Sequence, residues 1–238
     1  MNIGRFFFLG LIPGMLLSII LSVEAALSVS DFKTPYAGSL PAGSNCTVAL
    51  TALHPTQAVV GMKEVEHKKE KIDGKSPAKL EEYMLDHVVP IVVGPDGVPY
   101  MTDHHHTCLA LLESGRVSFA YAKIIDNWSD LTPSAFWSKM EAEHYCWLED
   151  AAGKPITPKQ LPTKITGMTD DPWRAVVWKL EHLGVIEKQP IYFFEFHWAD
   201  TLEKNIKVNP NQDFDGAVAA SQKFIESHPS VAPVPNSR

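Results

Sequence analysis

The sequence predicts an α/β (α+β) fold, with a compact mixed domain followed by a mainly helical C-terminal extension. Two observations support this prediction. Short apolar runs of strand length alternate with stretches of helical periodicity between residues 46 and 150. A connector rich in Pro, Gly, Lys and Thr follows at residues 151–169, and most of the chain from there to residue 227 has a helical pattern.

The first 25 residues have the organisation of an export signal. Arg5 supplies the positive charge, residues 6–21 are apolar, and small residues precede a cleavage site after Ala25. An uncleaved anchor is the alternative, because the apolar run approaches the roughly 18 residues of a membrane-spanning helix. Pro13 and the small residues favour cleavage. We therefore expect a secreted or periplasmic protein without stable membrane insertion.

The elements of the mixed domain can be placed in order after a lead-in at residues 26–45. The pattern predicts a strand over residues 46–53 that His54-Pro55 breaks, and a helix from Gly61 to Asp73. The following elements are a helix capped by Ser76, a strand over 88–93, a turn at 94–97, a strand over 98–102, a helix from Asp103 to Gly115, a strand over 116–126, and a helix opened by Thr132-Pro133. An aromatic stripe on the last helix predicts packing: Phe136, Trp137, Met140, His144 and Trp147.

The C-terminal extension, residues 151–227, is expected to pack on this domain. A helix begins at Asp171-Pro172 and ends near Gly184, and another helix covers residues 213–227. Residues 191–202 fit either a strand or a buried helix. Its residues Phe193, Phe194 and Trp198 are expected to be core, together with Trp173 and Trp178. Arg174 and Asp200 are expected to form an ion pair between the two halves of the fold. Residues 228–238 are predicted to be a disordered tail.

The residues with the clearest chemical potential lie in the stretch Tyr100–Gly115, which places an acid and three histidines at the start of a helix. Asp103 is a suitable N-cap, and a helix N-terminus favours anions. Adjacent helical residues point about 100° apart, so His104, His105 and His106 cannot all face one point. We expect His104 and His105 to face the mouth of a site and His106 to reach back or pack. Histidine is suited to proton transfer or metal binding near neutral pH.

Charge and cysteine content restrict the function classes. The formal net charge is −7, and the one basic cluster, at residues 67–71, is interleaved with Glu. Such a cluster is typical of a solvated helix face, which disfavours a processive nuclease on long DNA. Cys46, Cys108 and Cys146 allow one disulfide and leave a free thiol. Cys108 is expected to be buried or paired with Cys146.

Four patches of the sequence resemble the ParB/sulfiredoxin superfamily, and specifically its ParB-like nuclease group. They are LHPTQ with the following VG and EV (residues 53–65), VPIVV with its turn (89–97), TDHHH (102–106), and the pair DPWR (171–174) and EFHWAD (195–200). The resemblance covers roughly residues 50–202. It implies a compact ParB/sulfiredoxin-like domain in which the loop and helix after the hairpin bind phosphate.

The resemblance also implies roles for individual residues. Many superfamily members have a Gly where this chain has His104 and an Arg where it has Thr107, so one bidentate phosphate donor is replaced. Asp103, His104, Thr107, Gln57 and Lys68 are candidate ligand-binding residues. His105, His106 and Glu64 are candidate catalytic residues, with Glu64 as a general base.

Two functions of different classes fit these residues. The first is an exported ParB-like nuclease or phosphoryl-processing enzyme, a hydrolase or phosphotransferase. It would act on a phosphate-containing small molecule or nucleic acid fragment through the Asp-His-His-His box. The alternative is a noncatalytic module that keeps the fold and binds an anion or a protein. A divalent metal such as zinc, held by Asp103, one histidine, and Glu64 or His67, is a further possibility for the cofactor.

Overall fold

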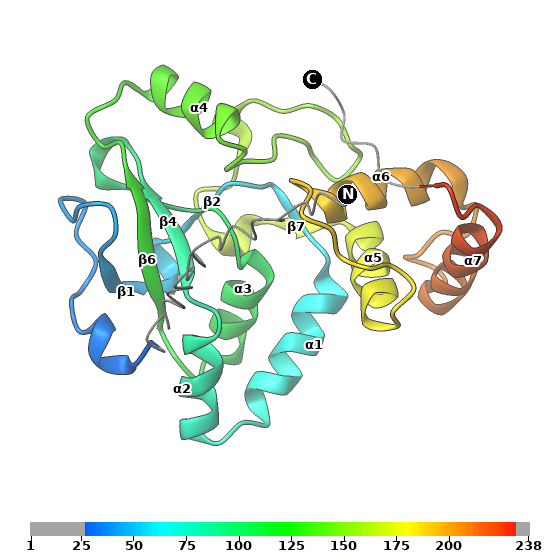
Figure 1. Cartoon of the computed structure of the whole chain (residues 1–238), viewed down its shortest axis with the longest axis horizontal. Helices are drawn as coiled ribbons and strands as arrows, with labels where there is room; N and C mark the ends of the chain where they lie inside the picture. The colour runs from blue at the N-terminus through cyan, green and yellow to red at the C-terminus, as the bar shows by residue number, and fades with distance from the viewer. Residues whose placement is uncertain (1–26, 232–238) are drawn as a thin grey trace, which may run out of the picture.

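The computed structural model describes residues 27–231 and contains a five-stranded mixed sheet beside a helical extension (Figure 1). The strand order is β1-β6-β4-β5-β2. Neighbouring strands are antiparallel in β1–β6 and β4–β5, and parallel in β4–β6 and β2–β5. The strands are β1 (Asn45–Ala49), β2 (His54–Pro55), β4 (Val89–Val93), β5 (Pro99–Met101) and β6 (Phe119–Asn127). The predicted mixed α/β architecture is confirmed.

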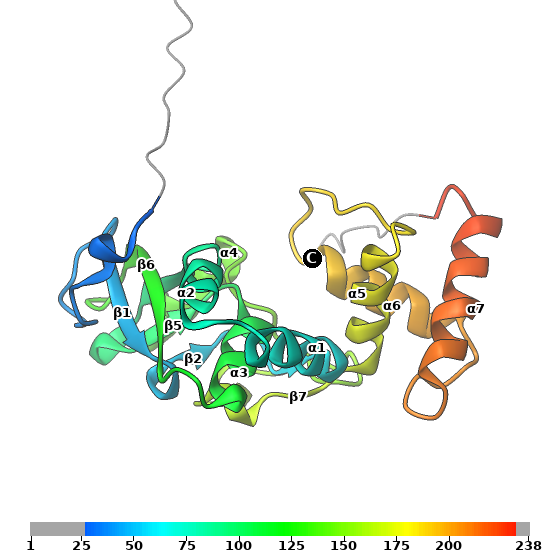
Figure 2. The same ribbon diagram turned by 90° about the horizontal axis from the view of Figure 1, so that it is seen from below.

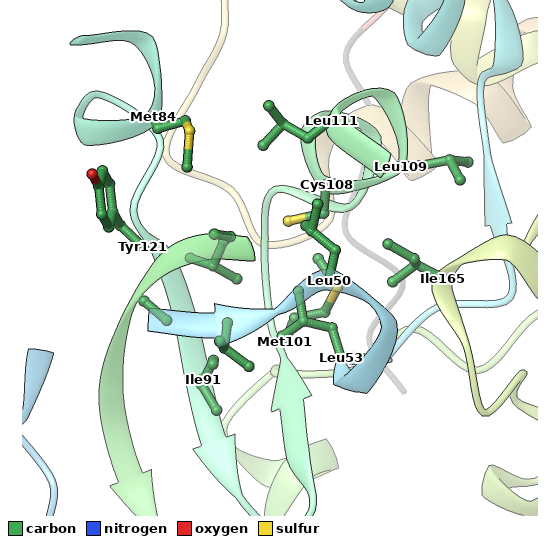
Figure 3. Packing of buried hydrophobic residues seen from close by; sticks show 14 of the residues in the cluster. Leu50, Leu53, Met84, Ile91, Met101, Cys108, Leu109, Leu111, Tyr121 and Ile165 are labelled. Carbon is green, nitrogen blue, oxygen red and sulfur yellow. The ribbon is translucent and has the colours of Figure 1, made fainter. Parts of the chain in front are cut away.

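The central strand β4 is apolar because both faces of the sheet are covered. Its side chains alternate: Val89, Ile91 and Val93 enter the main core, whereas Val92 enters a smaller core on the other face. In the main core, Ile91 and Met101 lie beneath the α3 residues Cys108 and Leu109 (Figure 3). The α4 residues Phe136 and Met140 belong to the smaller core. Packing against the sheet therefore fixes the position of α3.

The helices of the mixed domain begin and end close to their sequence signals. They are α1 (Met62–Asp73), α2 (Pro77–Leu85), α3 (His105–Ser114) and α4 (Pro133–Ala142). Ser76 caps α2 and Thr132 caps α4 through their side chains. Short 3-10 helices occur at η1 (Val29–Phe32), η2 (Leu50–Ala52), η3 (Pro95–Gly97), η4 (Pro158–Gln160) and η5 (Ile165–Gly167).

The extension consists of α5 (Pro172–His182), α6 (Phe194–Asn205) and α7 (Phe214–Ser227), which project away from the sheet (Figure 2). These helices have a hydrophobic cluster of their own, which includes Val176, Leu180 and Leu202. A two-stranded parallel sheet, β3 (Val59–Val60) with β7 (Thr169–Asp170), joins the extension to the domain. The connector residues Ile165 and Met168, by contrast, belong to the main core.

Several sequence-based predictions need correction. The first strand ends at Ala49, and His54-Pro55 forms β2 because it pairs with β5. The helix α4 ends at Ala142 and does not reach Trp147, because His144 has a left-handed backbone with φ of 55°. The ambiguous segment at residues 191–202 is largely helical, as α6 begins at Phe194.

The three cysteines are free and buried, so of the two alternatives for Cys108 burial is confirmed. Burial raises the pKa of the Cys46 thiol to about 11 and that of the Cys146 thiol to about 12. Among residues 27–231, no helix has the length and apolar character needed to cross a membrane. The predicted export signal and residues 232–238 of the predicted tail lie outside the described residues.

Candidate functional site

The site begins where two parallel strands end. Strands β2 and β5 pair in parallel, with Pro55 opposite Met101, so the residues that follow them meet at one edge of the sheet. The Thr56 hydroxyl donates to the Met101 carbonyl oxygen (2.9 Å) and fixes this junction. The chain after β5 then turns into α3, which places the start of that helix beside Thr56.

The start of α3 differs from the prediction. The N-cap is His104, in the left-handed region with φ of 63°, and not Asp103. The Asp103 carboxylate accepts from the His104 amide (2.6 Å) and caps no amide inside the helix. Helical hydrogen bonding begins with the Cys108 amide (2.9 Å to the His104 oxygen), so the preceding first-turn amides have no helical partner. Free amides at the start of a helix are a feature that favours anions.

Two of the three histidines are buried and held by backbone amides. The Thr56 amide donates to His105 Nε2 (3.2 Å), and the Gly61 amide donates to His106 Nε2 (3.0 Å). A ring nitrogen that accepts carries no proton, so in the neutral ring Nδ1 is the donor. Burial lowers the pKa of His105 to about 3, and burial and Arg174 hold that of His106 well below its usual range. Both rings are therefore neutral.

Glu64 contacts His106 from α1. Its Oε2 lies 3.4 Å from His106 Nε2, and its Oε1 lies 3.4 Å from Lys68 Nζ. Burial raises the pKa of Glu64, against the opposing effect of Lys68. The short distance suggests an ion pair, but burial disfavours both charged forms, so we interpret the contact as a carboxyl group and an imidazole that share one proton.

A cleft of about 280 Å³ opens beside these groups, between the start of α3 and the extension. It is lined by Gln57, Thr102, Asp103, His105, His106, His144, Arg174, Lys188 and residues 191–196. The neutral imidazoles of His105 and His106 thus reach the same space as the side chains of the extension. Because Nε2 of each ring is taken by a backbone amide, Nδ1 is the atom that remains for a ligand.

The extension contributes an ion-paired arginine to this cleft. Arg174 Nη2 donates to Glu195 Oε2 (2.6 Å), while Lys188 Nζ donates to Glu195 Oε1 (3.0 Å). Arg174 is 4% exposed, its Nε and Nη1 have no hydrogen-bond partner, and its guanidinium lies 3.7 Å from the Phe196 ring centroid. Burial opposes ionisation of Glu195, but Arg174 and Lys188 outweigh it and lower the pKa to about 2. The expected pair of Arg174 with Asp200 is wrong.

The structure brings only part of the predicted site together. Gln57, Asp103, His105 and His106 line the cleft, although the Gln57 amide nitrogen already donates to the Val59 carbonyl oxygen (2.6 Å). Glu64 and Lys68 lie behind His106 and are not among the lining residues. Thr107 is buried away from the cleft.

The predicted orientation of the histidines is also corrected. His104 does not line the cleft and contacts the ring of His87, 5.5 Å between centroids. His106, which was expected to reach back, lines the cleft and also contacts Glu64. The shift of the N-cap by one residue explains this, because each position on the first turn then points about 100° from where it was expected.

The residues proposed as metal ligands are not assembled. Within residues 27–231 no group of three or more His, Cys, Asp or Glu side chains is arranged to hold a metal ion. His67, one member of the expected set, instead contacts the rings of Trp178 (5.0 Å) and His182 (5.7 Å) on α5. The geometry therefore gives no support to that ligand set.

Comparison with known proteins identifies the family. Residues 46–204 match the model of a family described as Putative ParB-like nuclease, which is more than half of the chain. The chain belongs to this ParB-like nuclease family. The resemblance predicted from the TDHHH, DPWR and EFHWAD patches is thus confirmed.

A solved structure supports the fold of this ParB-like chain. It is similar to the crystal structure of protein Atu1540 from Agrobacterium tumefaciens, with 31% sequence identity and a TM-score of 0.71. The similarity covers 79% of this chain and 96% of that one. No curated protein matches the chain.

Sequence reasoning missed two charged residues that line the cleft and misassigned the partner of a third. Lys188 and Glu195 were not candidates, and Arg174 was paired with the wrong carboxylate. A signal for Glu195 was present, since it is the only charged residue within the aromatic run at residues 191–198. A charge among aromatic residues must be paired or face a cavity.

Proposed function

We propose that this ParB-like chain is a hydrolase of a phosphate-containing substrate, which it binds in the cleft at the start of α3. The observation that carries the proposal is the meeting, in one cleft, of a helix N-terminus, the cations Arg174 and Lys188, and two neutral imidazoles. Glu195 and Asp103, which also line the cleft, offset these two positive charges. The first-turn amides and the Nε and Nη1 donors of Arg174, which have no hydrogen-bond partner, favour a phosphate over a neutral ligand.

His106 is the proposed proton-transfer group. Its Nε2 has two neighbours, the Gly61 amide at 3.0 Å and the Glu64 carboxyl at 3.4 Å. As the Nδ1 proton passes to a leaving oxygen in the cleft, the protonated Glu64 carboxyl gives its own proton to Nε2, so the ring stays neutral and Glu64 becomes a carboxylate. In the reverse direction, Nδ1 accepts a proton from water while Nε2 returns its proton to the Glu64 carboxylate. Glu64 thus acts through His106 by exchanging a proton with Nε2.

His105 has a different proposed role. Its Nε2 is held by the Thr56 amide and, unlike His106 Nε2, forms no ion-pair contact with a carboxylate of residues 27–231. Its Nδ1–H is suited to donate a hydrogen bond to a phosphate oxygen without moving a proton. Asp103, at the mouth of the cleft, holds the backbone of the helix start through the His104 amide.

A noncatalytic anion-binding module is the second candidate function. The observation in its favour is the low pKa of both buried imidazoles, because a histidine that resists protonation is a weak general acid near pH 7. Such a module would use the same cleft and the same donors, and would release the phosphate compound unchanged.

The two functions are separated by an activity screen of the purified chain. Phosphate monoesters, phosphodiesters, and single- and double-stranded nucleic acid are incubated with it, with and without Mg²⁺, Mn²⁺ or Zn²⁺. We expect hydrolysis of one class, and a roughly 10²- to 10⁴-fold lower rate for His106→Gln. His228→Gln, at the C-cap of α7, is the control and should retain the parent rate. Absence of hydrolysis would favour the binding module, whereas an unchanged rate for His106→Gln would contradict the proton-transfer role of His106.

Export is a separate part of the proposal. The charge, apolar run and small residues of the first 25 residues support cleavage after Ala25 and release outside the cytoplasm. Mass measurement of the chain recovered from outside the cytoplasm should give a protein that begins at Ala26. An intact N-terminus in the cytoplasmic fraction would contradict this.

A further inference from the structure

A larger cavity adjoins the cleft. Its volume is about 690 Å³, within the range of small-molecule sites. The cavity and the cleft share four lining residues, His144, Ile191, Tyr192 and Phe193. The other lining residues are Glu141, Cys146, Trp147, Leu148, Glu149, Pro190 and His197. The larger cavity, which we call the aromatic pocket, therefore adjoins the cleft along these four residues.

Flat rings form the wall that the two spaces share. The Tyr192 ring is stacked on the His144 imidazole, with centroids 4.3 Å apart and planes at 22°. The Phe193 ring lies 5.0 Å from that of Trp147, which is itself stacked on Phe196 at 4.6 Å. Tyr192 is 64% exposed, the highest value among the exposed large hydrophobic side chains of residues 27–231. Its outer face is available to another flat ring.

The backbone that presents these rings is in an unfavourable conformation. His144 and Phe193 both have φ of 55°, although neither is glycine, and their rings lie 6.3 Å apart. A left-handed backbone is uncommon for residues with a side chain and costs free energy. Both residues line the aromatic pocket, so this backbone presents their two rings at its wall.

The two ends of the combined space differ in charge. The cations Arg174 and Lys188 line the cleft end together with the acids Asp103 and Glu195, whereas Glu141 and Glu149 line the aromatic pocket, to which no Lys or Arg contributes. A ligand with a negative group and an uncharged flat ring is thus oriented with the negative group toward α3. A nucleotide has this arrangement, and stacking on aromatic side chains is the usual way in which proteins hold unpaired bases.

We propose that the aromatic pocket binds an unpaired nucleobase, with Tyr192 as the stacking residue, while the attached phosphate lies in the cleft. This rests on the proposed function, because it places the phosphate in the same cleft. A base within a duplex is covered on both faces by its neighbours, so the substrate is a nucleotide or the end of a single strand, and not a duplex.

The test compares the affinity of three probes for the purified chain by titration calorimetry: a nucleoside 5′-monophosphate, the same nucleoside, and ribose 5-phosphate. We expect the monophosphate to bind most tightly. Tyr192→Ala should lower the affinity for the monophosphate roughly 10- to 100-fold and leave the affinity for ribose 5-phosphate unchanged. Tyr192→Phe keeps the aromatic ring and should keep the affinity for the monophosphate. Leu183→Ala, which alters another exposed hydrophobic residue, is the control and should change none of the three.

The results distinguish this inference from the proposed function. If ribose 5-phosphate binds as tightly as the monophosphate, or Tyr192→Ala affects both equally, the base site is wrong while the phosphate cleft stands. If the nucleoside binds as tightly as the monophosphate, the phosphate cleft is wrong. Two further probes locate the source of the base: a short single strand should compete with the monophosphate, and a blunt duplex that competes equally well would overturn the inference.

Discussion

Arg174 is the residue on which the extension's side of the cleft depends. Replacing it with Met leaves Glu195 partly buried with Lys188 as its remaining partner, and removes the contact with Phe196. We expect a loss of about 3 kcal/mol in the free energy of unfolding, measured with denaturant, because the Glu195 carboxylate loses its buried partner and keeps only the exposed Lys188.

A double variant isolates the cause of that loss. Arg174→Met combined with Glu195→Gln leaves no unpaired charge, so it should lose clearly less stability than Arg174→Met alone. Lys188→Ala is the comparison on the exposed side of the same carboxylate and should cost at most about 1 kcal/mol. Equal losses for the single and double variants would show that the ion pair is not what stabilises this position.

Glu181 makes stability depend on pH. Burial, with the nearby Glu195, raises its pKa to about 7, and its Oε1 has no hydrogen-bond partner. Between the unfolded pKa of about 4.3 and the folded value, the folded state keeps a proton that the unfolded state releases. The Glu181 contribution to stability is therefore present below about pH 4 and is lost as the pH rises to 7.

The Glu181→Gln variant tests this sign. It should be more stable than the parent at pH 8 by roughly 1 kcal/mol, a modest value because the partly exposed carboxyl is screened, and equally stable at pH 4. Melting temperatures at both pH values measure the difference, expected to be about 2–4 °C at pH 8. Glu66→Gln, at an exposed position on α1, is the control, and its effect on the melting temperature should be the same at both pH values. An equal effect of Glu181→Gln on the melting temperature at pH 4 and pH 8 would contradict this account.

At the scale of elements, the starts of α1 and α5 lie in direct contact. A Cβ atom on Gly61 would lie 2.6 Å from the Ala175 backbone nitrogen, so the two helices approach more closely than any other residue allows. This close approach and the β3–β7 pairing place the Gly61 amide within hydrogen-bond distance of His106. They also place Arg174 at the cleft. The site thus depends on helix packing as well as on its own side chains.

Gly61→Ala should therefore separate α1 from α5. We expect a loss of about 1–3 kcal/mol in the free energy of unfolding, together with weaker phosphate binding, because backbone cannot move aside as a flexible side chain can. Gly74→Ala, at the C-cap of α1, is the matched control. An added Cβ there meets its first neighbour at 3.6 Å and φ is −77°, so stability should be nearly unchanged or slightly higher. Equal effects of the two substitutions would contradict the close-contact argument.

Local signals predicted most elements well and the site only in part. Ser76, Thr132 and Asp171 each cap the helix that the sequence assigns to them. The start of α3 was misplaced by one residue because Asp103 has the N-cap chemistry, whereas His104 has the left-handed backbone. A preference for side-chain caps does not reveal a backbone conformation that tertiary contacts impose, here the bonds from Thr56 and Gly61 to the two following histidines.

At the scale of the whole molecule, the cleft lies between two hydrophobic clusters. The main core holds α3 on the sheet, and the second cluster holds α5, α6 and α7 together (Figure 1). Patches 171–174 and 195–200 could be recognised in the sequence as belonging with the histidine box. Their position relative to the histidine box could not be predicted, because it depends on the pairing of β3 with β7. Strands of two residues leave no recognisable pattern in the sequence. The pairing of Arg174 was misassigned for this reason.

The most direct measurement of the central claim is stabilisation of the chain by phosphate at constant ionic strength. At a free ligand concentration of ten times Kd, a ligand that binds only the folded state raises the free energy of unfolding by about 1.4 kcal/mol. This corresponds to an increase of roughly 3–6 °C in Tm. We expect this shift for the parent and a clearly smaller one for Lys188→Ala and for His106→Gln. Lys204→Ala, which alters another exposed lysine near a carboxylate, should keep the full shift. No shift for the parent, or equal shifts in all variants, would contradict a phosphate site at the start of α3.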